Sequence, residues 1–130
     1  MQSTNEIQWI NWSDEGAAWA NKMTSEDNDN GIKQMNSKMS LFKLLVSYAI
    51  TLESPIPEYD DSIFSKDNFS WGDLDPDKTF EHVLRLHFPD EKEIHKLSQK
   101  LAQFAYENIL NIQKDNPDFI LSDIFEESFE

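Results

Sequence analysis

The chain has 130 residues, with 25 acidic against 11 basic side chains and a formal net charge of −14. A field of this sign attracts basic partners and repels nucleic acid and anionic membranes. Cysteine is absent, which excludes disulfides, thiolate metal sites and cysteine nucleophiles. Apolar residues make up 38% of the chain, including nine Phe and four Trp, too many for a disordered acidic tail. We therefore expect one packed domain over residues 1–130.

The first predicted helix runs over residues 13–23. Ser13 followed by two acidic residues is typical of a helix N-cap with acids in the first turn. Trp12 and Trp19 are seven residues apart, and we expect them to share one face of this helix. The preceding apolar residues fit a short strand as well, so a minor β contribution near residues 6–12 is the alternative there.

The second predicted helix spans residues 32–52 and follows a polar loop at 24–31. Its apolar residues recur at three and four in two stripes: Ile32, Met35, Met39, Phe42, Val46 and Ala49, then Leu41, Leu45, Tyr48 and Leu52. A helix that is apolar nearly all round is usually central in a core. Pro55 and Pro57 end it, because proline cannot continue the hydrogen-bond ladder.

Residues 55–75 form the least regular stretch, which predicts one long acidic loop or a pair of short helices. Asp75 then has the features of an N-cap, with Pro76 at the first helical position. The spacing of the following apolar residues predicts a helix with one buried side made of Phe80, Val83, Leu84 and His87.

The longest predicted helix covers residues 91–114, with a capping box from Asp90 to Glu93 at its start. Its apolar stripe contains Ile94, Leu97, Leu101, Phe104, Ala105, Ile109 and Ile112. Asn116 and Pro117 end it. The residues after Asp118 are expected to form a last short helix capped by that aspartate, or alternatively a mobile acidic and apolar peptide that a partner captures. The whole pattern predicts an all-α, single-domain bundle of four to six helices with one long irregular acidic loop.

Two stretches resemble calcium-binding loops but lack essential positions. Residues 73–77 place acids at loop positions one, three and five, yet Lys78 stands where glycine makes the turn and Leu84 where a bidentate glutamate is needed. The other stretch has Gly31 at position six but Ser37 at position twelve. We therefore predict no metal site here.

Catalytic motifs are missing from the sequence. His82 and His87 are five residues apart and so lie on different faces of a helix, and HExxH is absent. The sequence has no Gly-x-Ser-x-Gly elbow and no phosphate-binding glycine loop. Direct binding of nucleic acid is disfavoured, because Arg85 is the sole arginine. We predict a protein that is not an enzyme and needs no cofactor.

We expect a cytoplasmic protein with no membrane partner. Residues 1–6 lack the basic and then apolar regions of a signal peptide. The longest mostly apolar stretch, 41–52, is interrupted by Lys43 and Ser47 and is too short to span a bilayer.

The acidic and aromatic residues of segment 58–77 are the best functional candidates. One interpretation makes Phe64, Phe69 and Trp71 core anchors beneath solvated acids. The other makes one or two rings surface anchors within an acidic rim that binds a basic protein. In that interpretation the partner-binding residues are Glu58, Tyr59, Asp60, Asp61, Asp67, Trp71, Asp73, Asp75 and Asp77.

These features favour a small inhibitor that occludes a basic, nucleic-acid-handling target, such as a nuclease toxin. Immunity or antitoxin proteins and phage-encoded inhibitors fit this physical class, with DNA mimicry as a sharper variant. The alternative is a non-enzymatic adaptor or secretion chaperone that holds a basic or apolar client segment. Sequence leaves the oligomeric state open.

Overall fold

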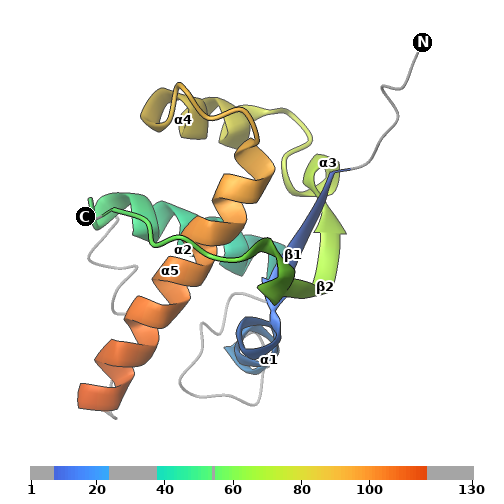
Figure 1. The fold of residues 1–130 in the computed structure, drawn as a ribbon. Coiled ribbons are helices and arrows are strands. Elements are labelled where there is room, and N and C mark those ends of the chain that lie inside the picture. The colour runs from blue at the N-terminus through green and yellow to red at the C-terminus, as the bar shows by residue number, and fades with distance from the viewer. Residues whose placement is uncertain (1–7, 24–37, 54, 117–130) are drawn as a thin grey trace.

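The computed structural model describes residues 8–23, 38–53 and 55–116, and in these ranges the protein is mostly helical, as predicted (Figure 1). In chain order the elements are β1 (Trp9–Ser13), α1 (Asp14–Met23), α2 (Lys38–Thr51), the 3₁₀-helix η1 (Asp61–Ile63), β2 (Phe64–Ser70), α3 (Trp71–Leu74), α4 (Thr79–His87) and α5 (Ile94–Asp115).

The core forms where α2 crosses α5 (Figure 1). From Lys38 onward, α2 matches the predicted central helix, with Leu41, Phe42, Leu45, Val46 and Ala49 buried. It ends at Thr51, shortly before the two prolines, and the start predicted at residue 32 lies outside the described residues. On α5 the facing stripe includes Leu97, Leu101, Ala105 and Ile109, all buried. The 3.6-residue period thus predicted both helices.

The two strands form an antiparallel pair that the sequence predicted only in part. β1 confirms the β contribution near residues 6–12, and its partner β2 lies where an irregular loop or short helices were expected. Ile10 pairs with Phe69 and Ser13 with Phe64 across the sheet. β2 is rich in Ser, Lys, Asp and Asn, so cross-strand pairing rather than local propensity sets its conformation.

Trp12 and Trp19 do not share a helix face, because Trp12 belongs to β1. Both are nevertheless buried, and Trp12 packs edge-on against Phe42 of α2. The predicted N-cap of α1 is confirmed, since the amide of Gly16 donates to Ser13 Oγ at 3.0 Å.

Both helices of the C-terminal half begin later than predicted. α4 starts at Thr79, preceded by Lys78 in the left-handed region at φ 62°. α5 starts at Ile94, and in the described chain its N-cap residue, Glu93, makes no side-chain capping bond, so the predicted capping box is wrong. Asp90 lies instead in a turn closed by the amide of Glu91, which donates to the carbonyl of Phe88, and it therefore stands four residues before the helix begins.

The buried side predicted for α4 is smaller than expected. Leu84 is its buried residue and Phe80 is half-buried, but Val83 and His87 are exposed. The last helix predicted after Asp118 lies outside the described residues. Within the described ranges, the apolar length that a bilayer crossing requires is reached by none of the helices.

Candidate partner-binding surface

The predicted contact residues fall into two groups at opposite ends of β2. Four precede the strand and four follow it, and a seven-residue strand spans roughly 20 Å. The acidic segment therefore does not gather into one patch. The side chain of Asp67, within β2, lies outside what the structure describes. The first group is Glu58, Tyr59, Asp60 and Asp61, and the second is Trp71, Asp73, Asp75 and Asp77.

The first group lies on a segment that crosses α5, drawn in green in Figure 1. Tyr59 fixes the crossing, because its hydroxyl donates to Glu107 Oε1 of α5 at 2.6 Å. The ring of Tyr59 also meets Phe64 edge-on, with 6.2 Å between the ring centroids. Burial, followed by the hydrogen bond to Glu107, raises the pKa of Tyr59. The phenol therefore stays a hydrogen-bond donor at neutral pH.

A chain of hydrogen bonds continues from Glu107 to the start of α1. Gln103 Nε2 donates to Glu107 Oε2 at 3.0 Å, and Ser13 Oγ donates to Gln103 Oε1 at 2.8 Å. Ser13 in turn accepts the amide of Gly16. A Cβ at Gly16 would lie 2.9 Å from Ser13 Oγ, so a larger residue there would push this hydroxyl from its position. The network joins segment 55–61, α5 and α1 into one rigid unit.

Further acids reach the same surface from distant parts of the chain. Asp14 Oδ1 accepts from Ser65 Oγ at 3.4 Å, which places the first turn of α1 beside β2. Burial raises the pKa of Tyr106, and the nearby charges of Glu15 and Glu107 raise it further. We call the set of carboxylates carried by these connected segments the acidic face: Asp14, Glu15, Glu58, Asp60, Asp61 and Glu107.

Sequence reasoning missed half of the acidic face. The sequence indicates Asp14 and Glu15 only as first-turn acids of a helix, and it does not single out Glu107. The first two are exposed, as are the three acids of segment 58–61, whereas Glu107 is half-buried. Nothing in the local pattern signals that these segments meet, because the meeting depends on the pairing of β1 with β2.

Asp60 and Ile63 give the acidic face its local shape. Asp60 Oδ1 accepts the amide of Ser62 at 3.0 Å and so caps η1. This hydrogen bond lowers the pKa of Asp60, which keeps the carboxyl ionised to lower pH. Ile63, at the end of η1, is an apolar side chain left 36% exposed next to the acids. Of the three rings that were candidates for surface anchors, Phe64 and Trp71 are buried and Phe69 is half-buried, as the interpretation of core anchors beneath solvated acids expects.

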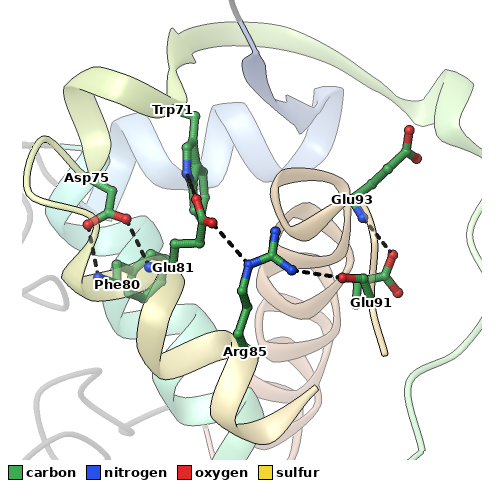
Figure 2. Close-up of polar contacts among 7 residues, drawn as sticks. All are labelled: Trp71, Asp75, Phe80, Glu81, Arg85, Glu91 and Glu93. Carbon is green, nitrogen blue, oxygen red and sulfur yellow. Dashed lines mark hydrogen bonds and ion pairs between the residues drawn. The ribbon is translucent and has the colours of Figure 1, made fainter. Parts of the chain in front are cut away.

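Two residues of the second group are buried and make hydrogen bonds within the molecule (Figure 2). Trp71 is 7% exposed, and its Nε1 donates to Glu81 Oε1 at 3.3 Å. Asp75 is 4% exposed, and its two carboxylate oxygens accept the amides of Phe80 and Glu81, each at 2.9 Å. Both residues hold α3 to α4, and we leave them out of the binding surface.

Asp73 and Asp77, the remaining members of this group, are exposed. Asp77 Oδ1 accepts the amide of Thr79 at 3.1 Å, and this bond lowers the pKa of Asp77. Stretch 73–84, which resembled a calcium loop, comprises the end of α3, a turn and the first part of α4. Among the described residues, no three His, Cys, Asp or Glu side chains are grouped so that they could hold an ion.

No family model, curated protein or solved structure matches this chain.

Proposed function

We propose that the protein is a small, non-enzymatic inhibitor that uses the acidic face to bind a basic protein. The proposed target handles nucleic acid, as a nuclease toxin does, and the proposed class is an immunity, antitoxin or phage-encoded inhibitor acting in the cytoplasm. The observation that carries the proposal is the convergence of acids from α1, segment 55–61 and α5 on one surface held by the bond from Tyr59 to Glu107.

The net charge explains how such an inhibitor would find its target. A nuclease has a cationic groove because its substrate is anionic, and the field of a molecule at −14 accelerates encounter with such a groove. Glu107, which accepts two hydrogen bonds, and Asp60, which caps η1, are already held in place and lose little conformational freedom on binding. Ile63 supplies an apolar contact inside the charged surface.

Charge reversal at Asp60 and Asp61 tests the role of the acidic face. The double variant D60K/D61K should slow association with the target by tenfold or more in low salt, on the order of known steering effects. It should change dissociation less, and the loss should shrink in high salt because screening removes long-range attraction. Stopped-flow mixing with the target, first identified by affinity capture from the native host, measures both rates.

The matched control is D73K/D77K, which makes the same change in net charge at the other end of β2. Each double variant also removes one aspartate that caps a backbone amide, Asp60 or Asp77, so the structural cost is similar. An equal slowing by both variants would show that only total charge matters and would refute the acidic face as the docking surface.

Competition with duplex DNA separates mimicry from ordinary complementarity. A DNA mimic is displaced from its target by duplex DNA and binds several unrelated DNA-binding proteins. An inhibitor of the immunity type binds a single partner. A captured client that is unfolded, or that keeps its activity when bound, would instead support the adaptor or chaperone alternative.

A further inference from the structure

A cavity that is partly open to solvent lies between α2 and α4. Its volume of about 410 Å³ falls within the roughly 300–1,000 Å³ that is usual for small-molecule pockets. Ile50 of α2 and Phe80 and Val83 of α4 give it an apolar wall. Ser47 of α2 and Thr79 of α4 add two hydroxyl groups to the lining. The cavity thus combines a wall for an apolar group with polar atoms that can orient a ligand.

Two opposite charges line the same cavity. Lys43 belongs to α2, and its Nζ lies over the ring of Phe80, 5.9 Å from the ring centroid. Asp77 comes from the turn before α4, and its Oδ1 accepts the amide of Thr79 at 3.1 Å. This hydrogen bond is the main cause of the lowered pKa of Asp77, and the charge of Lys43 lowers that pKa further. Asp77 is therefore ionised at neutral pH, and Lys43 lies close enough for the two charges to interact.

The two charges lie near each other but are not paired. Within the described ranges, neither Lys43 nor Asp77 forms an ion pair. Each is held on its own side of the cavity, Lys43 over the ring of Phe80 and Asp77 by the amide of Thr79. Asp75 also lines the cavity, but its two oxygens already accept backbone amides of α4. The cavity therefore presents one ammonium and one carboxylate that a ligand can still pair with.

This arrangement selects the ligand by its charges. An anion without a positive group would be repelled by Asp77 and by the field of a molecule at −14. A cation without a negative group would meet the ammonium of Lys43. An uncharged apolar molecule would remove both charged groups from water without giving either a partner, which is unfavourable. A zwitterion pairs with both charges at once, and an α-amino acid carries its ammonium and its carboxylate on the same carbon atom.

We propose that this cavity binds a free α-amino acid with a large apolar side chain, such as leucine. The ligand carboxylate binds Lys43, its ammonium binds Asp77, and its side chain lies against Ile50 and Val83. Because the cavity is partly open and the ligand is small, the dissociation constant is on the order of 0.1–1 mM. No residue of the acidic face lines this cavity, so the proposal does not depend on the proposed inhibitor function.

Titration of the uniformly ¹⁵N-labelled protein with L-leucine, followed by NMR, tests the site. The backbone amide signals of Ser47, Thr79 and Val83 should shift and approach saturation at about 10 mM ligand. Three analogues should bind at least tenfold more weakly: isocaproate, which lacks the ammonium, isoamylamine, which lacks the carboxylate, and glycine, which lacks the side chain. The absence of a saturable shift at these amides with leucine overturns the proposal, as does an analogue that binds as tightly as leucine.

Two substitutions test the charged contacts separately. Lys43→Met keeps a long side chain but removes the ammonium, and Asp77→Asn removes the charge but keeps an oxygen for the amide of Thr79. Each should weaken leucine binding at least tenfold. Asp73→Asn is the matched control, because Asp73 is an exposed aspartate that does not line the cavity. The spectrum of each variant without ligand reports its folding, and a wild-type affinity for leucine in either folded cavity variant would overturn the proposal.

Discussion

Asp75 shows how one acidic residue can look functional in sequence and be structural in the fold. Its carboxylate is almost fully buried and accepts two backbone amides at the start of α4. The first residues of a helix lack intrahelical partners for their amides, so this carboxylate satisfies two donors that would otherwise be buried unpaired.

Removal of the Asp75 carboxylate should destabilise the fold. Asp75→Ala should lower the free energy of unfolding by about 1–3 kcal/mol, because it leaves buried amides without an acceptor. Asp75→Asn keeps one oxygen acceptor and should cost less. Urea denaturation measures both. Asp73→Ala is the control, because Asp73 is exposed, and its free energy of unfolding should stay within about 0.5 kcal/mol of the wild-type value. Equal losses at Asp73 and Asp75 would contradict the capping role.

The sequence predicted the capping function of Asp75 but not the geometry behind it. An aspartate followed by proline indicates a helix start, and the prediction placed that start at Pro76. The helix begins at Thr79 instead, because Lys78 adopts a left-handed conformation that no local pattern specifies. The N-cap of α4 is therefore Lys78 and not Asp75, but the Asp75 carboxylate reaches across the intervening turn and accepts the amides of Phe80 and Glu81.

At the scale of elements, Glu81 connects α3 to α4. Its carboxylate accepts from Arg85 Nε within α4 and from Trp71 Nε1 of α3 (Figure 2). The hydrogen bond from Arg85, and then the one from Trp71, lower the pKa of Glu81. A carboxyl with a lowered folded-state pKa stabilises the fold above its unfolded pKa, and this contribution disappears as the pH falls through the folded value.

Glu81→Gln should therefore show a stability defect that depends on pH. The variant should be less stable than the wild type by about 1 kcal/mol at pH 7, and the gap should close as the pH falls from about 5 to about 3. Urea unfolding across this range measures the gap. Glu93→Gln is the control, because the pair of Glu93 with Lys96 is exposed and should contribute under about 1 kcal/mol. A gap that is the same at every pH would show that the charge of Glu81 is unimportant.

Elements with strong periodicity were predictable, and the strand pair was predictable only in part. α2 and α5 carry apolar residues at helical spacing, and their burial in the core confirms them. β2 has a polar sequence held by Phe64 and Phe69 and by pairing with β1, a non-local interaction that local reasoning does not detect. The same strand separates the two groups of predicted contact residues.

For the whole molecule, the sequence predicted exposed acids around Asp60 but not which other acids lie near them, and binding of a partner there stays a prediction. It correctly singled out the exposed acids around Asp60 as charged and solvent-facing, yet grouped them with Asp75 and Trp71, which lie inside. Asp14 and Glu107 join the surface only because α1 and α5 meet segment 55–61 in the folded protein. Which acids gather is a property of the topology.

The net charge of −14 should make the fold more stable as salt is added. Like charges repel in the folded state more than in the expanded chain, and raising ionic strength from about 10 mM to about 1 M shortens the screening length from roughly 30 Å to roughly 3 Å. Salt also weakens favourable pairs, but in the part of the chain that the structure describes Lys96–Glu93 is exposed, Arg85–Glu81 is partly exposed, and each contributes about 1 kcal/mol or less. Repulsion should therefore dominate, and Tm should rise by several degrees.

Thermal unfolding in sodium chloride and in sodium perchlorate measures this effect. The two salts screen charge equally, so a rise in Tm that is common to both reports screening, and a difference between them reports ion-specific exclusion. D60K/D61K, which lowers the magnitude of the net charge by four, should gain less from salt than the wild type. A Tm that falls with salt in both proteins would mean that ion pairing outweighs repulsion. Repulsion among the unpaired acids would then be too weak to destabilise the fold, which would contradict their crowding on one surface.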